Sequence, residues 1–367
     1  MGRVEEGRGA TAYQALRECT RGLLSAGDTK GALTVAQAAN KIFPAEPQSG
    51  FDLGAILMLA KADPVAARAV LENALKRTGR FTQPSPSDRA LALSNLGRLA
   101  LSRGEARVAR GLFDEGLKLD PESSILLYNA AAADLKLRDA VSCLGHFRAA
   151  FARAPGDATR DDYLLGAWAY NQTDRFADAE ALLRGAIAKL PNESGLHLNL
   201  GLSLAMGGRP VEALLEYLYE FENGSANDVY SKQAREQFED ALARPQATPR
   251  SADAIEALRA AISGERIKPK EVLSHLQWLE EAGYRHPALD LLRAEALHAS
   301  GDIQAAETAF RRLLESDPAF LPSYYDLSLV LRATGRREEA LRLVSEAAKR
   351  NPSHWQLLGE GPPISAR

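Results

Sequence analysis

The sequence predicts an all-α protein, built as an α-solenoid of stacked helix pairs. Helix-ending prolines recur at a fixed interval, since Pro121 and Pro155 are 34 residues apart and so are Pro318 and Pro352. Glycine, alanine and aromatic residues return at the same offsets between such prolines, whereas the period-2 alternation of β-strands is nearly absent. One helix pair cannot bury its own apolar face, so pairs that repeat along a chain must stack on their neighbours.

The clearest repeat unit reads NLGRLALSRGEARVARGLFDEGLKLDP. Gly97 and Ala109 are small, which lets the two helices of a pair approach closely. Gly104 supplies the positive φ that closes the first helix before a short turn. A proline cannot continue a helix and marks the connection to the next unit. The unit therefore predicts one antiparallel pair, with helices around Asp88–Ser102 and Glu105–Leu119.

This 34-residue pattern resembles the tetratricopeptide repeat family. Number each repeat so that the leucine-glycine pair stands at positions 7–8; the turn glycine then falls at 15, alanine at 20, an aromatic residue at 24 and proline at 32. The register can be followed through most of Tyr13–His354, although the second unit, around Gly54 and Ala67, matches poorly. The resemblance implies a right-handed superhelix of tandem helix–turn–helix repeats. Alanines at position 20 are Ala32, Ala109, Ala179, Ala213, Ala306 and Ala340.

Breaks in the register divide the chain into segments. We expect a flexible N-terminus over residues 1–12 and a first array over 13–242, closed by an amphipathic helix at Val229–Leu242. Residues 243–251 are proline-containing and polar, which indicates a linker. A second, smaller array is expected over 252–358, with Glu271–Ala282 as one helix of an off-register pair, followed by a disordered tail over 359–367.

Composition excludes several classes of partner. The chain of 367 residues carries 45 Lys+Arg against 48 Asp+Glu, a net charge of −3, which argues against nucleic acid or a polybasic membrane surface as the main partner. No signal-peptide pattern opens the chain, and no apolar stretch approaches the roughly 20 residues of a membrane span. These features predict a soluble, cytoplasmic protein without membrane insertion, provided that no leader has been removed.

No catalytic or metal-binding pattern is recognisable. The six histidines show no HExxH or paired-ligand spacing, and no glycine-rich nucleotide motif follows a strand-like run. Cys143 and Cys19 occupy repeat positions 20 and 7, where a small packed residue is expected. His197 at position 4 is expected to be a packed core histidine. The sequence therefore predicts a protein that is not an enzyme and has no cofactor.

A candidate binding surface follows from the repeat numbering. Positions 2, 6, 9 and 13 lie opposite the packed face of each first helix, and the family resemblance implies that this face lines a concave peptide groove. Asn95, Asn129 and Asn199 share position 6, while Leu165 breaks the series. An amide offers a donor and an acceptor, so it can pair with an extended backbone of any sequence. The alternative is that these amides bond neighbouring helices or face water.

Trp168 stands at position 9, where the repeat pattern asks for no large residue, and is a candidate anchor, with packing against an adjacent helix as the alternative. The other groove candidates are Arg98, Tyr128 and Leu202. Too few basic residues are present for a carboxylate clamp, so a largely apolar peptide of a protein partner is expected. The alternatives are a scaffold acting through its convex or edge surfaces, and a substrate-recruiting arm of an enzyme on another chain.

Overall fold

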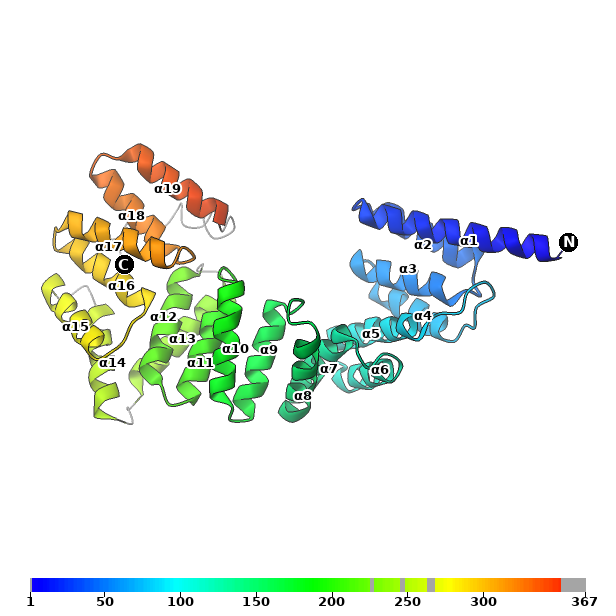
Figure 1. Ribbon diagram of the computed structural model, residues 1–367, viewed down its shortest axis with the longest axis horizontal. Coiled ribbons are helices and arrows are strands. Elements are labelled where there is room, and N and C mark those ends of the chain that lie inside the picture. The colour runs from blue at the N-terminus through cyan, green and yellow to red at the C-terminus, as the bar shows by residue number, and fades with distance from the viewer. Residues whose placement is uncertain (1, 225–227, 245–247, 263–267, 351–367) are drawn as a thin grey trace. The chain divides into compact units, whose positions relative to one another are not determined.

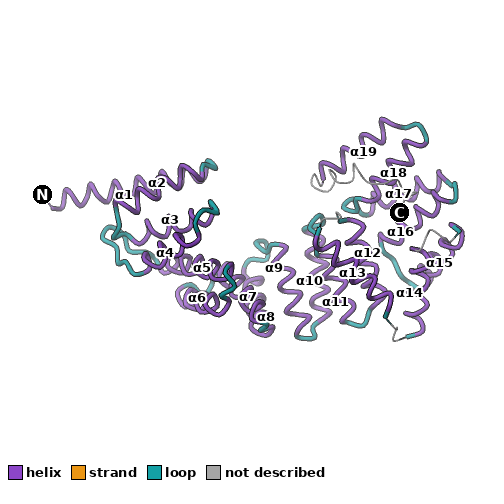
Figure 2. The backbone as a smooth tube through the Cα atoms, turned by 180° about the vertical axis from the view of Figure 1, so that it is seen from behind, coloured by secondary structure: helices purple, strands orange, loops and turns teal. Residues whose placement is uncertain are grey.

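The computed structural model describes residues 2–224, 228–244, 248–262 and 268–350 and confirms the all-α class. The described residues form nineteen helices and contain no strand (Figures 1 and 2). The chain divides into two compact units, Met1–Ala158 (unit 1) and Thr159–Arg367 (unit 2). In both, most successive helices pack on each other as hairpins, because their connections are short; the exception is α13 and α14 in unit 2.

Unit 1 contains eight helices: α1 (Gly2–Ser25), α2 (Thr29–Ile42), α3 (Pro47–Leu59), α4 (Pro64–Leu75), α5 (Pro86–Ser102), α6 (Ala106–Leu119), α7 (Ser124–Leu137) and α8 (Ala140–Arg153). Unit 2 contains eleven: α9 (Arg160–Gln172), α10 (Phe176–Lys189), α11 (Leu196–Met206), α12 (Pro210–Asn223), α13 (Val229–Ala243), α14 (Pro249–Ile262), α15 (Pro269–Glu281), α16 (Pro287–Ala299), α17 (Ile303–Ser316), α18 (Pro322–Ala333) and α19 (Arg337–Arg350).

The pair α5–α6 forms where the repeat pattern predicts it. Ser85 caps α5 in a capping box with Asp88, which satisfies otherwise free amide groups of the first turn. Gly104 has a φ of 79°, which closes the helix as expected. A side chain at Gly97 would overlap the ring of Phe113, which is fully buried between the two helices. The small residues of the repeat thus mark the points of closest helix approach.

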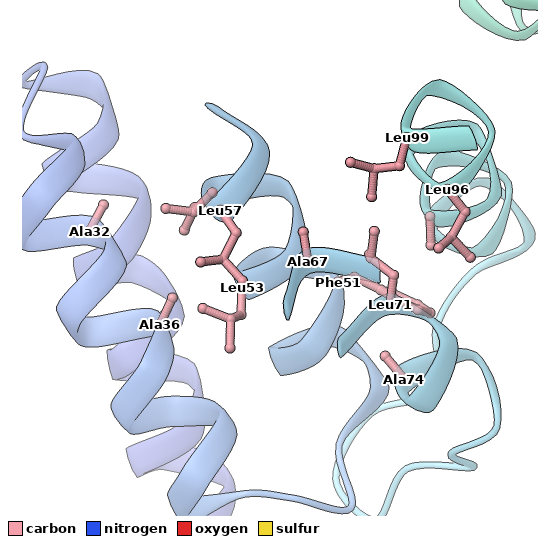
Figure 3. Packing of buried hydrophobic residues seen from close by; sticks show 12 residues of the cluster. Ala32, Ala36, Phe51, Leu53, Leu57, Ala67, Leu71, Ala74, Leu96 and Leu99 are labelled. Carbon is pink, nitrogen blue, oxygen red and sulfur yellow. The ribbon is translucent and has the colours of Figure 1, made fainter. Parts of the chain in front are cut away.

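Alanine and leucine fill the core between α2, α3, α4 and α5 (Figure 3). Leu53 and Leu57 point toward the helix that carries Ala32 and Ala36. The alanines let α2 approach α3 closely, and the leucines occupy the remaining space. Within this cluster, α3 and α4 share their apolar side chains with the helices before and after them.

Charged residues repeat the same contact between consecutive helix pairs. Arg68 on α4 pairs with Glu105 at the start of α6, with 3.1 Å between Nη1 and Oε2. Glu307 on α17 pairs with Arg336 at the start of α19 at 2.7 Å, with the two charges exchanged. Both contacts join repeat position 21 to position 16 of the following repeat. Such partly exposed ion pairs contribute about 0–1 kcal/mol each to the free energy of unfolding. Their main effect is therefore on how consecutive helix pairs are aligned with each other.

Helix α12 occupies the centre of unit 2 and is buried on nearly all sides. It packs against α11 and α13, as a second helix of a repeat should, and also contacts α14 and α16. The helix expected at Val229–Leu242 is therefore present as α13 and covers α12. The expected off-register pair is present as α14 and α15, which pack on each other.

Three expectations change or stay open. Residues 2–12 belong to α1, so the flexible N-terminus expected over 1–12 is helical wherever it is described. Cys19 is exposed rather than packed, because it lies on the outer side of α1. The proposed boundary between two arrays near 243–251 stays a prediction; residues 245–247 and the tail expected to be disordered, 359–367, lie outside the described residues.

Candidate interaction surface

Two large apolar side chains are exposed at equivalent positions on neighbouring first helices of unit 1. Leu91 on α5 is 52% exposed and Ile125 on α7 is 58% exposed. They are 34 residues apart, one repeat length, and α5 and α7 contact each other directly. Arg98 lies two turns beyond Leu91 on the same side of α5 and is also exposed, as is Lys136 near the end of α7. We call these four residues the first-helix face of unit 1.

The asparagines of unit 1 make structural contacts. Asn95 is only 8% exposed. Asn129 donates from Nδ2 to Ser94 Oγ at 3.0 Å and so joins α7 to α5. This contact corresponds to the alternative in which the amide bonds a neighbouring helix. The Oδ1 atom of Asn129 keeps acceptor capacity, because an amide oxygen has two lone pairs and the bond to Ser94 is made by the amide nitrogen.

Tyr128 lies in the core of the helix pair rather than in an open groove. Its side chain is buried, and its ring centroid is 6.3 Å from that of Phe147 on α8. Tyr128 lies three residues before buried Ala131, so the two share one side of α7. The sequence grouping of Tyr128 with the groove residues therefore differs from its position in the structure.

Unit 2 presents three of the predicted residues on α9 and α11, which contact each other. Trp168 on α9 and Leu202 on α11 are half-buried, so each keeps part of its side chain accessible. Asn199 is also half-buried and donates from Nδ2 to the carbonyl of Gly195, one turn earlier, at 2.8 Å. We call Trp168, Asn199 and Leu202 the first-helix face of unit 2. Leu165, which breaks the asparagine series, is buried.

The sequence reasoning missed an amide contact in this region. Asn171 Nδ2 donates to Ser203 Oγ at 2.9 Å and joins α9 to α11. The corresponding bond in unit 1 runs from Asn129 to Ser94. The two bonds use different repeat positions, so a search at position 6 alone could not find Asn171. A pair of polar residues at facing positions of consecutive first helices is the sequence signal that would have indicated this hydrogen bond.

Exposed valines on the second helices were also missed. Val65 on α4 is 65% exposed and Val141 on α8 is 75% exposed, and Val108 on α6 is exposed as well. Each lies in the first turn of its helix, outside the pattern of packed positions 20, 24 and 27. A helical-wheel comparison of the second helices would have found them, because an amphipathic helix places polar residues on that side.

Buried polar groups near these surfaces are arranged for structure rather than chemistry. Asp134 on α7 is buried, forms an ion pair with Arg110 at 2.8 Å and is hydrogen-bonded to His146 Nδ1 at 2.8 Å. Burial raises the pKa of the Cys143 thiol to about 12, with Asp134 adding to the shift, so the thiol stays protonated and unreactive near neutral pH. The described residues contain no cluster of three or more His, Cys, Asp or Glu suited to hold a metal ion. Among them, no helix combines the length and apolar character needed to cross a membrane.

Comparisons with known proteins agree with the repeat architecture. A family model described as "Tetratricopeptide repeat" matches residues 285–359, and another with the same description matches 53–124 and 164–228, together more than half of the chain. A tetratricopeptide repeat protein from Parabacteroides merdae is 15% identical, with 78% of this chain and 99% of that chain covered and a TM-score of 0.43. The structure of MamA protein is 17% identical, with 51% and 94% covered and a TM-score of 0.40. No curated protein matches the chain.

Proposed function

Because this chain belongs to the tetratricopeptide repeat family, we propose that it is a non-catalytic protein–protein interaction module whose first helices bind an extended, largely apolar peptide of a partner. The supporting observation is the exposure of Leu91 and Ile125 at equivalent positions of adjacent helices. Single exposed apolar residues are normal on protein surfaces. Their repetition in register is what favours a binding role, since an extended peptide contacts successive repeats in the same way.

The energy available from this contact is moderate. Full burial of a leucine or isoleucine side chain contributes about 1.5–3 kcal/mol, and each of the two is roughly half exposed. Covering both would contribute on the order of 2 kcal/mol, so further contacts are needed for stable binding. Arg98 can add a hydrogen bond to a peptide carbonyl, and Asn129 can accept one from a peptide N–H.

In unit 2, we assign Trp168 the role of an anchor, with Leu202 beside it and Asn199 Oδ1 as an acceptor for a peptide N–H. Tryptophan combines a large apolar surface with a polar N–H and is enriched among residues that dominate binding energy. Asn95 and Tyr128 are buried, so in this proposal they hold α5 and α7 in position and do not touch the peptide.

Affinity purification with variants of the full chain tests the proposal. Leu91→Ser with Ile125→Ser changes the first-helix face of unit 1, and Val65→Ser with Val141→Ser is a matched control on the second helices. All four side chains are at least half exposed, so both double variants should fold. A partner retained by wild type and the control but lost by the first double variant supports the proposal. Retention by both double variants and by Trp168→Ala would contradict it.

A second candidate function is a scaffold that binds partners through the outer second-helix surface. The observation that favours it is the exposure of Val65, Val108 and Val141 on three consecutive second helices. The same experiment separates the two candidates, since loss of a partner only in the Val65→Ser, Val141→Ser variant would assign binding to the second helices.

A further inference from the structure

A buried carboxylate–histidine contact in unit 2 connects the C-terminal repeats to α12. Glu216 on α12 is buried, and its Oε2 atom lies 2.7 Å from His197 Nδ1 on α11. The same oxygen lies 3.6 Å from Nε2 of His286, the residue that precedes α16. Glu216 is thus shared between a helix of the central repeat and the start of a helix pair that follows about 70 residues later in the chain.

Aromatic rings extend the same contact toward α18. The ring of Tyr219 stacks on His197, with centroids 3.9 Å apart, and on Phe320, with centroids 4.4 Å apart. Asn223 Oδ1 accepts a hydrogen bond from the backbone N–H of Leu321 at 2.8 Å. We call Glu216, His197, His286, Tyr219 and Phe320 the Glu216 joint. It holds α16 and the α17–α18 connection against α12.

The protonation of the carboxylate and of one histidine follows from these contacts. Burial alone would raise the pKa of Glu216, but the hydrogen bonds from His197 and His286 outweigh burial and hold it well below its usual range. Glu216 is therefore ionised and can only accept, so His197 Nδ1 is the donor. His286 Nδ1 accepts from the N–H of Ala288 at 3.2 Å and caps α16, which places the proton of its neutral ring on Nε2, toward Glu216.

The two histidines differ in what a second proton would do. A proton on His197 enters at Nε2, keeps the bond from Nδ1 to Glu216 and turns it into a charge-assisted bond, which is roughly twice as strong as a neutral one. A proton on His286 must enter at Nδ1, where it removes the cap of α16 and places a positive charge at the positive end of that helix. Only His197 can gain charge without losing a contact.

We propose that the Glu216 joint is a pH-sensitive latch, in which protonation of His197 tightens the packing of α16–α19 against α12 and deprotonation loosens it. Histidine is the side chain whose charge ordinarily changes between about pH 5 and pH 8. When His197 is neutral, the buried carboxylate keeps a charge that is only partly compensated, which costs free energy in a water-poor site. The imidazolium removes that cost.

Other charged groups from the neighbouring elements lie around the joint. Glu220 on α12 accepts from the backbone N–H groups of Gly195 and Leu198 at the start of α11. Carboxylates from the other packed elements are Asp228 before α13, Asp290 on α16 and Asp317 beside Tyr219. Arg184 on α10 lies 3.8 Å from Glu216 Oε1, but its side chain is half exposed, so solvent weakens its effect.

Hydrogen exchange of the full chain, measured by mass spectrometry between about pH 6 and pH 8 and corrected for intrinsic rates, tests the latch. If closing takes up a proton, the closing equilibrium changes by at most about tenfold per pH unit. We expect protection of α16 and α18 to be higher at pH 6 than at pH 8, by at most about a hundredfold over these two pH units. Protection of α5 and α6 in unit 1 should not change.

Two variants assign the effect to one ring. His197→Gln can still donate to Glu216 but cannot gain charge, so the pH dependence of α16 and α18 should disappear. His286→Asn keeps a side-chain cap without a titratable ring, and the pH dependence should remain. A flat wild-type profile, or pH dependence that survives His197→Gln and disappears in His286→Asn, overturns the proposal. If His197→Gln does not fold, the ring resonances of His197 in the wild type must shift over the pH interval in which protection changes; otherwise the proposal is wrong.

Discussion

Replacing Glu46 with alanine should destabilise unit 1 by about 2–4 kcal/mol, because its carboxylate fastens the α4–α5 connection to the start of α3. Glu46 is 1% exposed. Its Oε1 atom accepts from the backbone N–H groups of Arg80 and Phe81 at 2.6 and 2.8 Å. Its Oε2 atom accepts from the N–H and the hydroxyl of Thr82 at 3.2 and 3.1 Å.

The magnitude follows from two opposing contributions. Hydrogen bonds to a charged acceptor contribute about 1.5–3 kcal/mol each, which for four bonds sums to roughly 6–12 kcal/mol. Against this stands the cost of burying a carboxylate, which is several kcal/mol after relaxation. Arg80 is exposed and Phe81 and Thr82 are half-buried, so water can reach some of the freed donors. The net loss is therefore about 2–4 kcal/mol.

Glu46→Gln should cost less, about 1–2 kcal/mol. Its amide oxygen can still accept from Arg80 and Phe81, whereas its NH₂ group faces the N–H of Thr82. Urea denaturation followed by circular dichroism, with hydrogen exchange over residues 79–82, measures both changes. The control is Glu115→Gln, since Glu115 is exposed on α6. Equal midpoints for Glu46→Ala and the control, or a larger loss for Glu46→Gln than for Glu46→Ala, would refute this account.

Three further outcomes are expected. Ala213 is buried on α12, so Ala213→Leu should overpack its helix pair and lower the free energy of unfolding by about 1–3 kcal/mol. Exposed Arg107→Leu should change the free energy of unfolding by less than about 0.5 kcal/mol. Equal unfolding midpoints for wild type and Ala213→Leu would show that the repeat register is wrong. Because the pKa of Glu216 is lowered in the folded protein, the ionised carboxylate stabilises the fold fully above its pKa in the unfolded chain, near 4.3, and loses this effect as the pH falls toward its pKa in the folded protein. The free energy of unfolding should therefore drop more steeply below about pH 4 in wild type than in Glu216→Gln. Trp168→Ala should weaken binding of an identified partner by about thirtyfold in calorimetry, with only a modest loss of affinity between low and physiological salt, and unchanged affinity would remove Trp168 from the site.

The helix-pair architecture could be predicted because its signals are local and recur at every repeat. Gly104 requires a positive φ, Gly97 requires close approach, and prolines such as Pro121 and Pro155 end several of the units, and these constraints act within about 34 residues of the chain. The first-helix positions were also predictable, since Leu91 and Ile125 follow from the same numbering. Position alone did not separate exposed from buried residues, however, because Asn95 and Tyr128 share the helices of Leu91 and Ile125 and are buried.

Contacts between residues distant in the chain were decided only by the tertiary structure. The repeat numbering indicates that His197 is packed, but not that Glu216 and His286 meet it, because α13, α14 and α15 lie between α12 and α16 in the sequence. Glu46 reads as an ordinary surface residue next to Pro47 until the α4–α5 connection folds over it. Helix periodicity depends on residues that are close together along the chain, so the sequence alone predicts it. The partner of a buried charge depends on which surfaces stack, and that is settled by the packing of whole helices.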